Sequence, residues 1–435
     1  MNFFKLWGEF MMQGARRYAQ WEVDNAKTIL GSRKRLFILG LLILPIILGG
    51  FVFADQVGDK LPSFLGSKSA YSPAFYSNFI FIASILIGIC AGLITGAIGA
   101  GGGFIIAPAL MSAGIKGILA VGTDLFHIFA KAIMGSVIHR KLGNVSVPLA
   151  VVFLIGSIGG STLGGYVNRL LYDKNPVLSD AFITTIYVLM LGFLGAYSLI
   201  DYVRSRKAMA GGADMGDAHG GGKGKKEGAD IGGLPRKLQS INIPPMVKFD
   251  HDFTPGGRGI SWIFLVLSGA LVGLAAGIMG VGGGFLTFPI FVYMLGVSSM
   301  TTVGTDILQI VFTAGYSAIT QYAIYGFIFY TLAMGMLLGS LIGIQVGAMA
   351  TKVVPGITIR GFYAMAVLAG FVNRFFALPS KLAAMNYIPL SAGMGKILNQ
   401  IGNWAFFFVI GTFAVWVIGT FLKNISVLKG EEGHS

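Results

Sequence analysis

The sequence is poor in charged residues and holds a single cysteine. Charged residues are 11% of the 435 residues, against about 25% in soluble domains. A water-soluble fold is excluded, because 54% of the residues are hydrophobic and a soluble core could not bury so many. Cys90 is the only cysteine, so no disulfide can form within the chain, and we interpret it as a packing residue.

The sequence also lacks the motifs of common enzyme classes. It contains no Ser-His-Asp arrangement and no His-Glu-x-x-His pair, so we expect no enzyme activity, no metal and no cofactor. His219 and His251 have no partner ligands at metal spacing, and we interpret both as solvated. The Gly-x-Gly-Gly-Gly sequences follow no strand pattern, which argues against a nucleotide loop.

What the chain has instead is long apolar runs. Residues 36–54, 75–98 and 401–422 are each close to the ~20 residues that a spanning helix needs, and further runs follow the same pattern. We therefore predict an all-α integral membrane protein with many membrane segments that are embedded in the lipid bilayer. We expect residues 36–54 to be a retained anchor helix and 401–422 an additional C-terminal membrane helix.

The net charge of +14 comes from Lys and Arg that gather in an N-terminal arm, 1–35, and in a central loop. Cytoplasmic anchoring explains this charge more simply than nucleic acid, so we expect no nucleic-acid partner. The arm has helical amphipathic spacing, which suits either a helix on the membrane surface or one that packs on the protein's own loops. The expected location is the cell membrane, with the N-terminus and the central loop in the cytoplasm.

An internal duplication organises the chain. Gly-Ala-Ile-Gly-Ala-Gly-Gly-Gly-Phe at 96–104 matches Gly-Ile-Met-Gly-Val-Gly-Gly-Gly-Phe at 277–285, and Val-Gly-Thr-Asp follows in both halves. The repeats, 75–201 and 260–378, each predict a helix, a glycine turn, a short Pro-containing segment and three further helices, about five membrane segments. Residues 202–259 are glycine-rich and basic, and we interpret them as a flexible linker.

The positions of positive charge predict that the two repeats are inverted. If the arm and the linker both lie in the cytoplasm, the chain crosses the membrane an even number of times between them. One of these crossings is the anchor helix, so the first repeat crosses an odd number of times, and the second repeat has the opposite orientation in the membrane. If the glycine-flanked segment re-enters the membrane instead of spanning it, the repeats would run parallel.

The glycine turns are the first candidate binding site. Glycine runs before short Pro-interrupted segments, at matching places in both halves, indicate broken helices that meet near the membrane midplane. A helix that begins at such a turn aims free N–H groups at it and could bind an anion. The alternative is that these glycines only permit close helix packing.

Ionisable residues after each turn form the second candidate. Asp124, His127 and Lys131 fall on one helical face, and the second half has Asp306 and Gln309 at the matching positions. Lys131 could attract an anion while Asp124 and His127 exchange protons, or Asp124 and Lys131 could form an internal ion pair. The predicted anion-binding set is Gly101, Gly102, Gly103, Thr123, Asp124, His127, Lys131, Gly282, Gly283, Gly284, Thr305, Asp306 and Gln309. We place Asp180 and Arg374 near helix ends, where their side chains can reach the membrane surface.

These duplicated glycine turns with downstream Gly-Thr-Asp motifs resemble the sulfite exporter TauE/SafE family over residues 75–378. The resemblance implies two repeats of membrane helices and transport of sulfite, organosulfonates or related sulfur compounds. The family usually has Thr-Ser where this chain has Thr-Asp, so substrate charge or proton coupling can differ. The arm, the anchor, the linker and the C-terminal helix are additions to the family core.

The leading hypothesis is a secondary transporter of a small sulfur-containing anion (sulfite, sulfonate, sulfate or thiosulfate) that works by alternating access with proton coupling. The alternative is a non-transporting membrane sensor or scaffold subunit that recruits partners through the basic linker. A channel is a third hypothesis. The direction of transport and assembly into a homo-oligomer stay open.

Overall fold

The structure is a computed structural model that describes residues 78–98, 102–141, 145–210, 233–250, 257–350, 354 and 356–424. The predicted arm and anchor helix, Gly101 and the glycine-rich basic part of the linker lie outside these residues. Within them, seven helices are long and apolar enough to cross a membrane, which confirms the predicted all-α membrane class.

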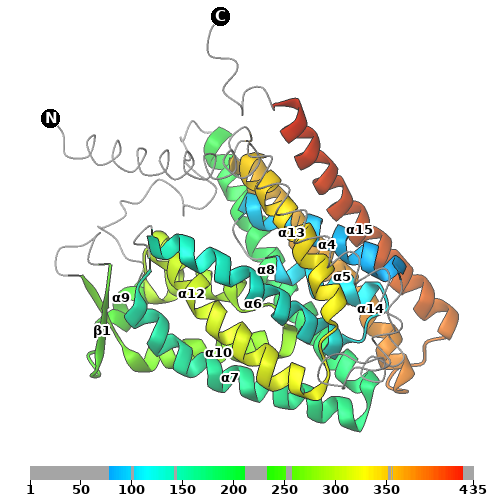
Figure 1. The fold of residues 1–435 in the computed structure, drawn as a ribbon, viewed down its shortest axis with the longest axis horizontal. Coiled ribbons are helices and arrows are strands. Elements are labelled where there is room, and N and C mark those ends of the chain that lie inside the picture. The colour runs from blue at the N-terminus through cyan, green and yellow to red at the C-terminus, as the bar shows by residue number, and fades with distance from the viewer. Residues whose placement is uncertain are drawn as a thin grey trace, which may run out of the picture. The chain divides into compact units, whose positions relative to one another are not determined.

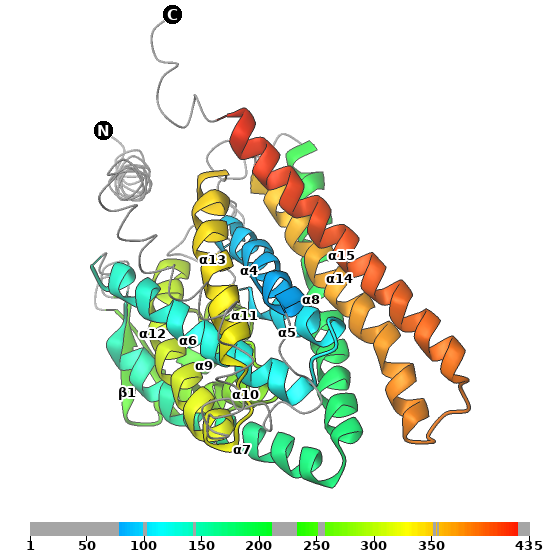
Figure 2. The same ribbon diagram turned by 45° about the vertical axis from the view of Figure 1, so that its right-hand side comes forward.

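Each half contains the predicted series of helices (Figure 1). The first half consists of α4 (Asn78–Ile98), α5 (Gly103–Ser112), α6 (Gly117–Lys141), α7 (Val147–Lys174) and α8 (Pro176–Ala210). The second half consists of α10 (Trp262–Met279), α11 (Gly284–Pro289) with the π-helix η3 (Ile290–Leu295), α12 (Ser299–Ser317) with η4 (Ala318–Tyr322) and η5 (Ala323–Tyr325), α13 (Tyr330–Ala350) and α14 (Gly356–Ala384). The additional C-terminal helix is α15 (Ala392–Lys423), which packs on α14 (Figure 2).

The two halves interlock, because the first helix of each packs on the fourth helix of the other. α4 pairs with α13 and α10 with α7, and both pairs run parallel at backbone contact. Gly88 leaves no room for a Cβ against the backbone of Met336, and the matching Gly269 leaves none against Phe153. Small residues permit this approach, as in other membrane helix pairs.

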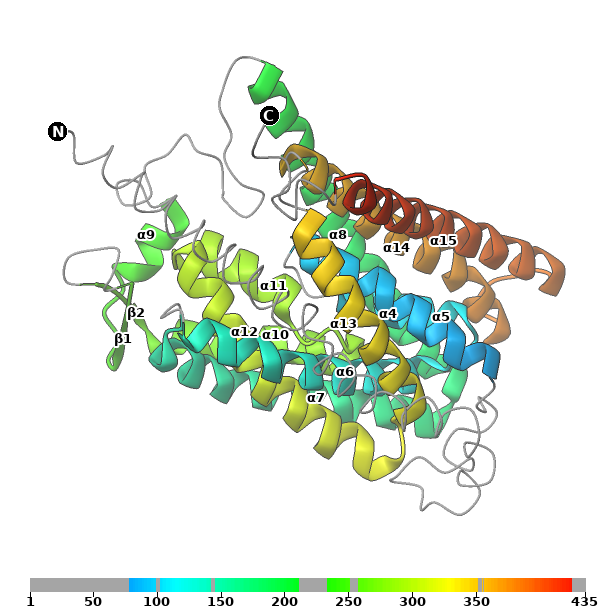
Figure 3. The same ribbon diagram turned by 45° about the horizontal axis from the view of Figure 1, so that its top comes forward.

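Equivalent helices of the two halves also touch, and they run antiparallel. α8 packs along α14, with Gly192 against Phe371 and Gly361 against Tyr202. Helix α6 also runs antiparallel to α12 and packs along it and along η4, as Figure 3 allows the reader to follow.

The helices break at the glycine turns. α10 ends at Met279, and Gly280 and Gly283 adopt φ of 78° and 89°, a left-handed conformation that side chains with a Cβ rarely adopt. α11 then begins at Gly284. In the first half α4 ends at Ile98 and α5 begins at Gly103, so the predicted break occurs in both halves.

Part of the segment that we predicted to be a flexible linker is folded. It holds α9 (Gly233–Gln239) and an antiparallel pair of strands, β1 (Met246–Phe249) and β2 (Arg258–Ser261). Asp250 accepts hydrogen bonds from the Ser298 N–H (2.9 Å) and from the Thr301 hydroxyl (2.6 Å) at the start of α12. Glycine content alone predicted flexibility, and these long-range bonds to the next repeat could not be read from it.

Candidate functional site

The two glycine turns meet on α6. A Cβ at Gly103 would lie 2.8 Å from Ile128 and 3.0 Å from Val281, the residue that follows Gly280 in the second turn. A Cβ at Gly282 would also contact Ile128, at 2.8 Å. The structure therefore brings Gly103 and Gly282 to one buried place, as the broken-helix prediction requires.

Three polar side chains satisfy the last carbonyls of α10 at this break. Asn168 Nδ2 donates to the carbonyl of Ile278 (2.9 Å), and the Tyr322 hydroxyl donates to that of Gly277. The Tyr187 hydroxyl donates to the carbonyl of Met279 at 2.5 Å. Unpaired backbone groups are costly in lipid, so these side chains stabilise the broken helix. Sequence reasoning gave no role to either tyrosine.

Asp124 is the least satisfied polar group of the site. It is fully buried, and neither carboxylate oxygen makes a hydrogen bond of good geometry with the described residues, although the carboxylate interacts with the backbone of Ala107 in α5. Its Oδ1 lies 3.6 Å from Nδ1 of the buried His127, and this nitrogen has no hydrogen-bond partner among the described residues. The other ring nitrogen, Nε2, forms a 2.9 Å hydrogen bond with the Ser340 hydroxyl. A buried carboxylate beside an unpaired imidazole nitrogen is suited to holding a proton between them.

Lys131 lies on the same face of α6, next to the first glycine turn. Its ammonium is 3.4 Å from the Thr95 hydroxyl, and that hydroxyl accepts a hydrogen bond from the Gly102 N–H at 2.8 Å. No carboxylate among the described residues lies within ion-pair distance of Lys131, but Lys131 and Asp124 interact electrostatically inside the protein. A cation thus lies near the N-terminus of α5, with Asp124 as its charge partner beyond direct contact.

The second half places a bonded chain at the equivalent positions. Gln309 Nε2 donates to Asp306 Oδ1 (2.9 Å), and Thr313 donates to Gln309 Oε1 (2.9 Å). Thr313 also shares a 3.0 Å hydrogen bond with Ser157 of α7. The other carboxylate oxygen of Asp306 lies against Gly284, where a Cβ would be 3.0 Å away. An internal carboxylate therefore already lies at the first residue of α11.

The two motif threonines each accept a backbone hydrogen bond from the opposite half. Thr123 accepts a hydrogen bond from the N–H of Phe329 (2.9 Å), the residue before α13. Thr305 accepts one from the N–H of Ser146 (3.0 Å), the residue before α7. Each threonine caps the fourth helix of the opposite half, so both hydroxyls join the two halves.

The structure groups the predicted residues unequally. Gly102, Gly103, His127, Lys131 and Asp124 gather around the first turn, and Gly284, Asp306 and Gln309 gather around the second. Gly283 packs against Val272 of α10. Sequence reasoning missed Thr95 and Ser340, because each is a single hydroxyl in an apolar helix and only the fold brings it to α6.

Comparison with known proteins gives a family match. The family model described as Sulfite exporter TauE/SafE matches residues 84–374, which include both glycine turns and all ten repeat helices at least in part. No solved structure matches the chain.

Three curated proteins are similar to this chain. One is "Probable membrane transporter protein YunE" of Bacillus subtilis (strain 168), 24% identical over 276 residues, 62% of this chain and 87% of that protein. A second from the same organism, "Probable membrane transporter protein YjnA", is 23% identical over 271 residues, 61% of this chain and 89% of its own. "Sulfite exporter TauE/SafE family protein 6" of Arabidopsis thaliana is 40% identical over 74 residues, 17% of each chain.

Proposed function

The chain belongs to the sulfite exporter TauE/SafE family of membrane transporters, and from this premise we propose that it is a secondary transporter of a small sulfur-containing anion. The anion is sulfite, sulfate, thiosulfate or a sulfonate. The family name and the third relative's name support this class of substrate. The anion binds at the N-terminus of α5, beside Gly102, Gly103 and Lys131.

The asymmetry between the two turns carries this proposal. At the second turn, the Asp306 carboxylate lies at the first residue of α11 and is held by Gln309. At the first turn, Lys131 lies near the N-terminus of α5, and no carboxylate of the described residues lies within ion-pair distance of it. Helix N-termini and lysine both favour an anion, so the N-terminus of α5 can take a substrate anion where α11 already has the Asp306 carboxylate.

Proton coupling is assigned to Asp124 and His127. Both are buried, and the facing atoms of the two side chains make no hydrogen bond of good geometry with the described residues. A charge in this position is costly in a low-dielectric interior unless a proton neutralises it. A proton bound here together with the anion at Lys131 would keep the loaded site near neutrality while the halves move.

Alternating access then follows from the two interlocked halves. The antiparallel contacts of α8 with α14 and of α6 with α12 support inverted repeats. Positive charge at the end of α8 supports a cytoplasmic linker in the cell membrane. The halves rock about the central glycine turns, and Lys131 faces one side of the membrane at a time.

Uptake of labelled sulfite into proteoliposomes tests the proposal, with and without a pH gradient and with sulfate, thiosulfate and a sulfonate as competitors. We expect saturable uptake that one competitor blocks. Lys131→Gln should raise KM by about 10- to 100-fold, since hydrogen bonds to charged groups contribute about 1.5–3 kcal/mol. Lys396→Gln, at an exposed position of α15, is the matched control and should leave KM unchanged.

Two results would contradict the proposal. If no sulfur anion moved or competed while the protein stayed folded, the substrate class would be wrong, and recruitment of a partner through the basic linker would become the function to test. If uptake were saturable but Lys131→Gln behaved like Lys396→Gln, the binding site would be wrong.

A further inference from the structure

Arg374 of α14 is a buried cation that the proposed transport cycle does not use. Its side chain is 1% exposed and is the largest fully buried side chain among the described residues. Its place near the end of the helix predicted that it would reach the membrane surface. That prediction is wrong, because α5, α8 and α15 enclose this part of α14.

The guanidinium of Arg374 has only neutral partners. Nε donates to Asn373 Oδ1 and Nη2 donates to the Ser112 hydroxyl, each at 2.7 Å. A guanidinium has five N–H donors, so several remain without an acceptor among the described residues. No described carboxylate forms an ion pair with it.

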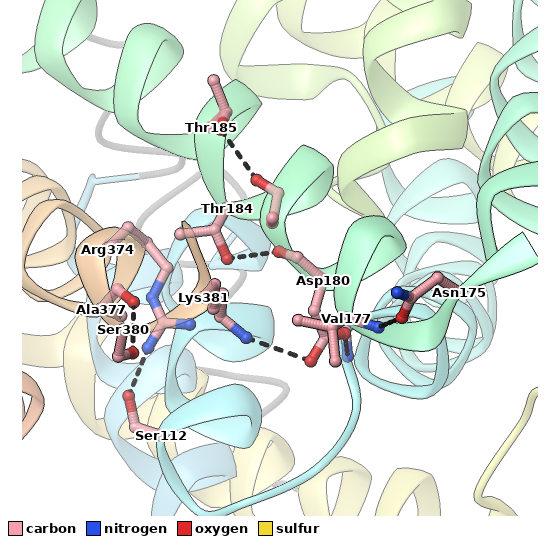
Figure 4. Close-up of polar contacts among 12 residues, drawn as sticks. Ser112, Asn175, Val177, Asp180, Thr184, Thr185, Arg374, Ala377, Ser380 and Lys381 are labelled. Carbon is pink, nitrogen blue, oxygen red and sulfur yellow. Dashed lines mark hydrogen bonds and ion pairs between the residues drawn. The ribbon is translucent and has the colours of Figure 1, made fainter. Parts of the chain in front are cut away.

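The nearby carboxylate of Asp180 is already engaged (Figure 4). Lys381 donates to its Oδ2 at 3.1 Å, and the N–H of Gly117 donates to its Oδ1 at 2.7 Å. The carboxylate of Asp180 thus interacts with both Lys381 and Arg374, and of these two cations Arg374 is the buried one.

We propose that Arg374 binds a small sulfur oxyanion as a second station, separate from the one at Lys131. A planar guanidinium matches two oxygens of an oxyanion, and an unpaired cation within a membrane protein normally faces a substrate pathway. Ser112 ends α5 and Gly103 begins it, so the two stations lie at opposite ends of one helix, about 15 Å apart. The identity of the anion rests on the proposed function.

A neighbouring pair of asparagines orients this cation. Asn373 accepts from Arg374 and donates through Nδ2 to Asn403 of α15 at 2.9 Å. Asn403 lies beyond the family match, which ends at Arg374. The additional helix α15 is thereby connected to the second station, and Asn403 acts as a positioning residue for it.

Anion-dependent thermal unfolding of the full-length protein tests the proposal, in neutral detergent with sulfate or thiosulfate against chloride at matched ionic strength. The Lys131→Gln background removes the first station. In it we expect stabilisation by sulfate to persist, and Arg374→Gln to abolish it. Arg374→Lys keeps the positive charge but loses the paired N–H donors of the guanidinium, so it should raise the half-saturating concentration of sulfate about tenfold or more. Arg169→Gln, whose cation has carbonyl partners on Gln321, is the control for net charge and should change nothing.

Several outcomes would overturn the proposal. One is an unchanged half-saturating concentration in both Arg374 variants; Arg374→Lys provides this comparison even if Arg374→Gln fails to fold. Another is stabilisation by phosphatidylglycerol in place of sulfate, which would assign the cation to a lipid phosphate. Sulfate binding that depends on Arg374 while proteoliposomes show no flux would uphold this site and count only against the proposed function.

Discussion

At the scale of single residues, one short motif does two different jobs. The threonine of each Val-Gly-Thr-Asp motif caps a helix of the opposite half, whereas the following aspartate faces the site. The sequence predicted that both would bind substrate, because adjacent polar residues in an apolar chain look alike without the fold. The cap partner, Phe329, is far along the chain, and no local pattern points to it.

Removing one cap should weaken the joint between the halves. Thr123→Val keeps the shape but removes the hydroxyl that accepts from the Phe329 N–H, and loss of this hydrogen bond should cost about 1 kcal/mol of stability. Thr123→Ser keeps the hydroxyl and should preserve the unfolding temperature. Thermal unfolding of both variants, and of Thr305→Val, measures this. A role in substrate binding alone would instead leave the temperature unchanged and raise KM.

Neutralising Asp124 should separate stability from coupling. Asp124→Asn replaces a buried carboxylate, whose charged form is penalised by burial, with a neutral amide of the same shape, so we expect an unfolding temperature equal to or above that of the parent protein. The variant should still exchange anion between the two sides, while an imposed pH gradient should no longer drive accumulation. Retained accumulation under a pH gradient would remove Asp124 from the coupling mechanism.

At the scale of helices, small residues decide how closely the two halves pack. Gly160 of α7 has no room for a Cβ against Ala270 of α10, whereas Gly159, its neighbour, faces open space. Glycines in an apolar helix indicate close helix packing, but they do not indicate that the partner helix belongs to the other half. The spacing of small residues indicates which face of a helix can pack closely. Only the fold shows which distant segment packs against that face.

A pair of neighbouring substitutions tests this packing. Gly160→Ala should destabilise the protein by about 1–3 kcal/mol or more, because backbone on both sides resists movement. Gly159→Ala should be neutral or stabilise by up to about 1 kcal/mol, since alanine is the better helix former. Folded yield and unfolding temperature measure both, and equal effects would contradict the interlocked pairing of α7 with α10.

At the scale of the whole molecule, the sequence predicted the duplication, the broken helices and the membrane class. These predictions are confirmed because repeated motifs and apolar length are properties of the chain itself. The packing of α4 and α10 against the opposite half, the folded parts of the linker at 233–250 and 257–261, and the burial of Arg374 depend on contacts between distant segments. No single-chain pattern encodes those contacts.

Inversion of the repeats predicts opposite locations for the C-terminal ends of α8 and α14. In a Cys90→Ala background, Arg206→Cys should react with an impermeant maleimide only from the cytoplasmic side, and Tyr387→Cys only from the other side. Asn175→Cys, at the start of α8, should behave like Tyr387→Cys, because Asp180 and Lys381 join those two ends. Reaction of Arg206→Cys and Tyr387→Cys from the same side would mean parallel repeats.

A counterflow experiment tests most directly whether this chain is a carrier for a sulfur anion. Proteoliposomes loaded with unlabelled sulfite are diluted into a trace of labelled sulfite, with no pH gradient or membrane potential. For a carrier we expect a transient accumulation of label above equilibrium, which Lys131→Gln reduces and Lys396→Gln preserves. Entry of label without any overshoot would indicate a channel, and no entry at all in a folded protein would contradict transport of this anion.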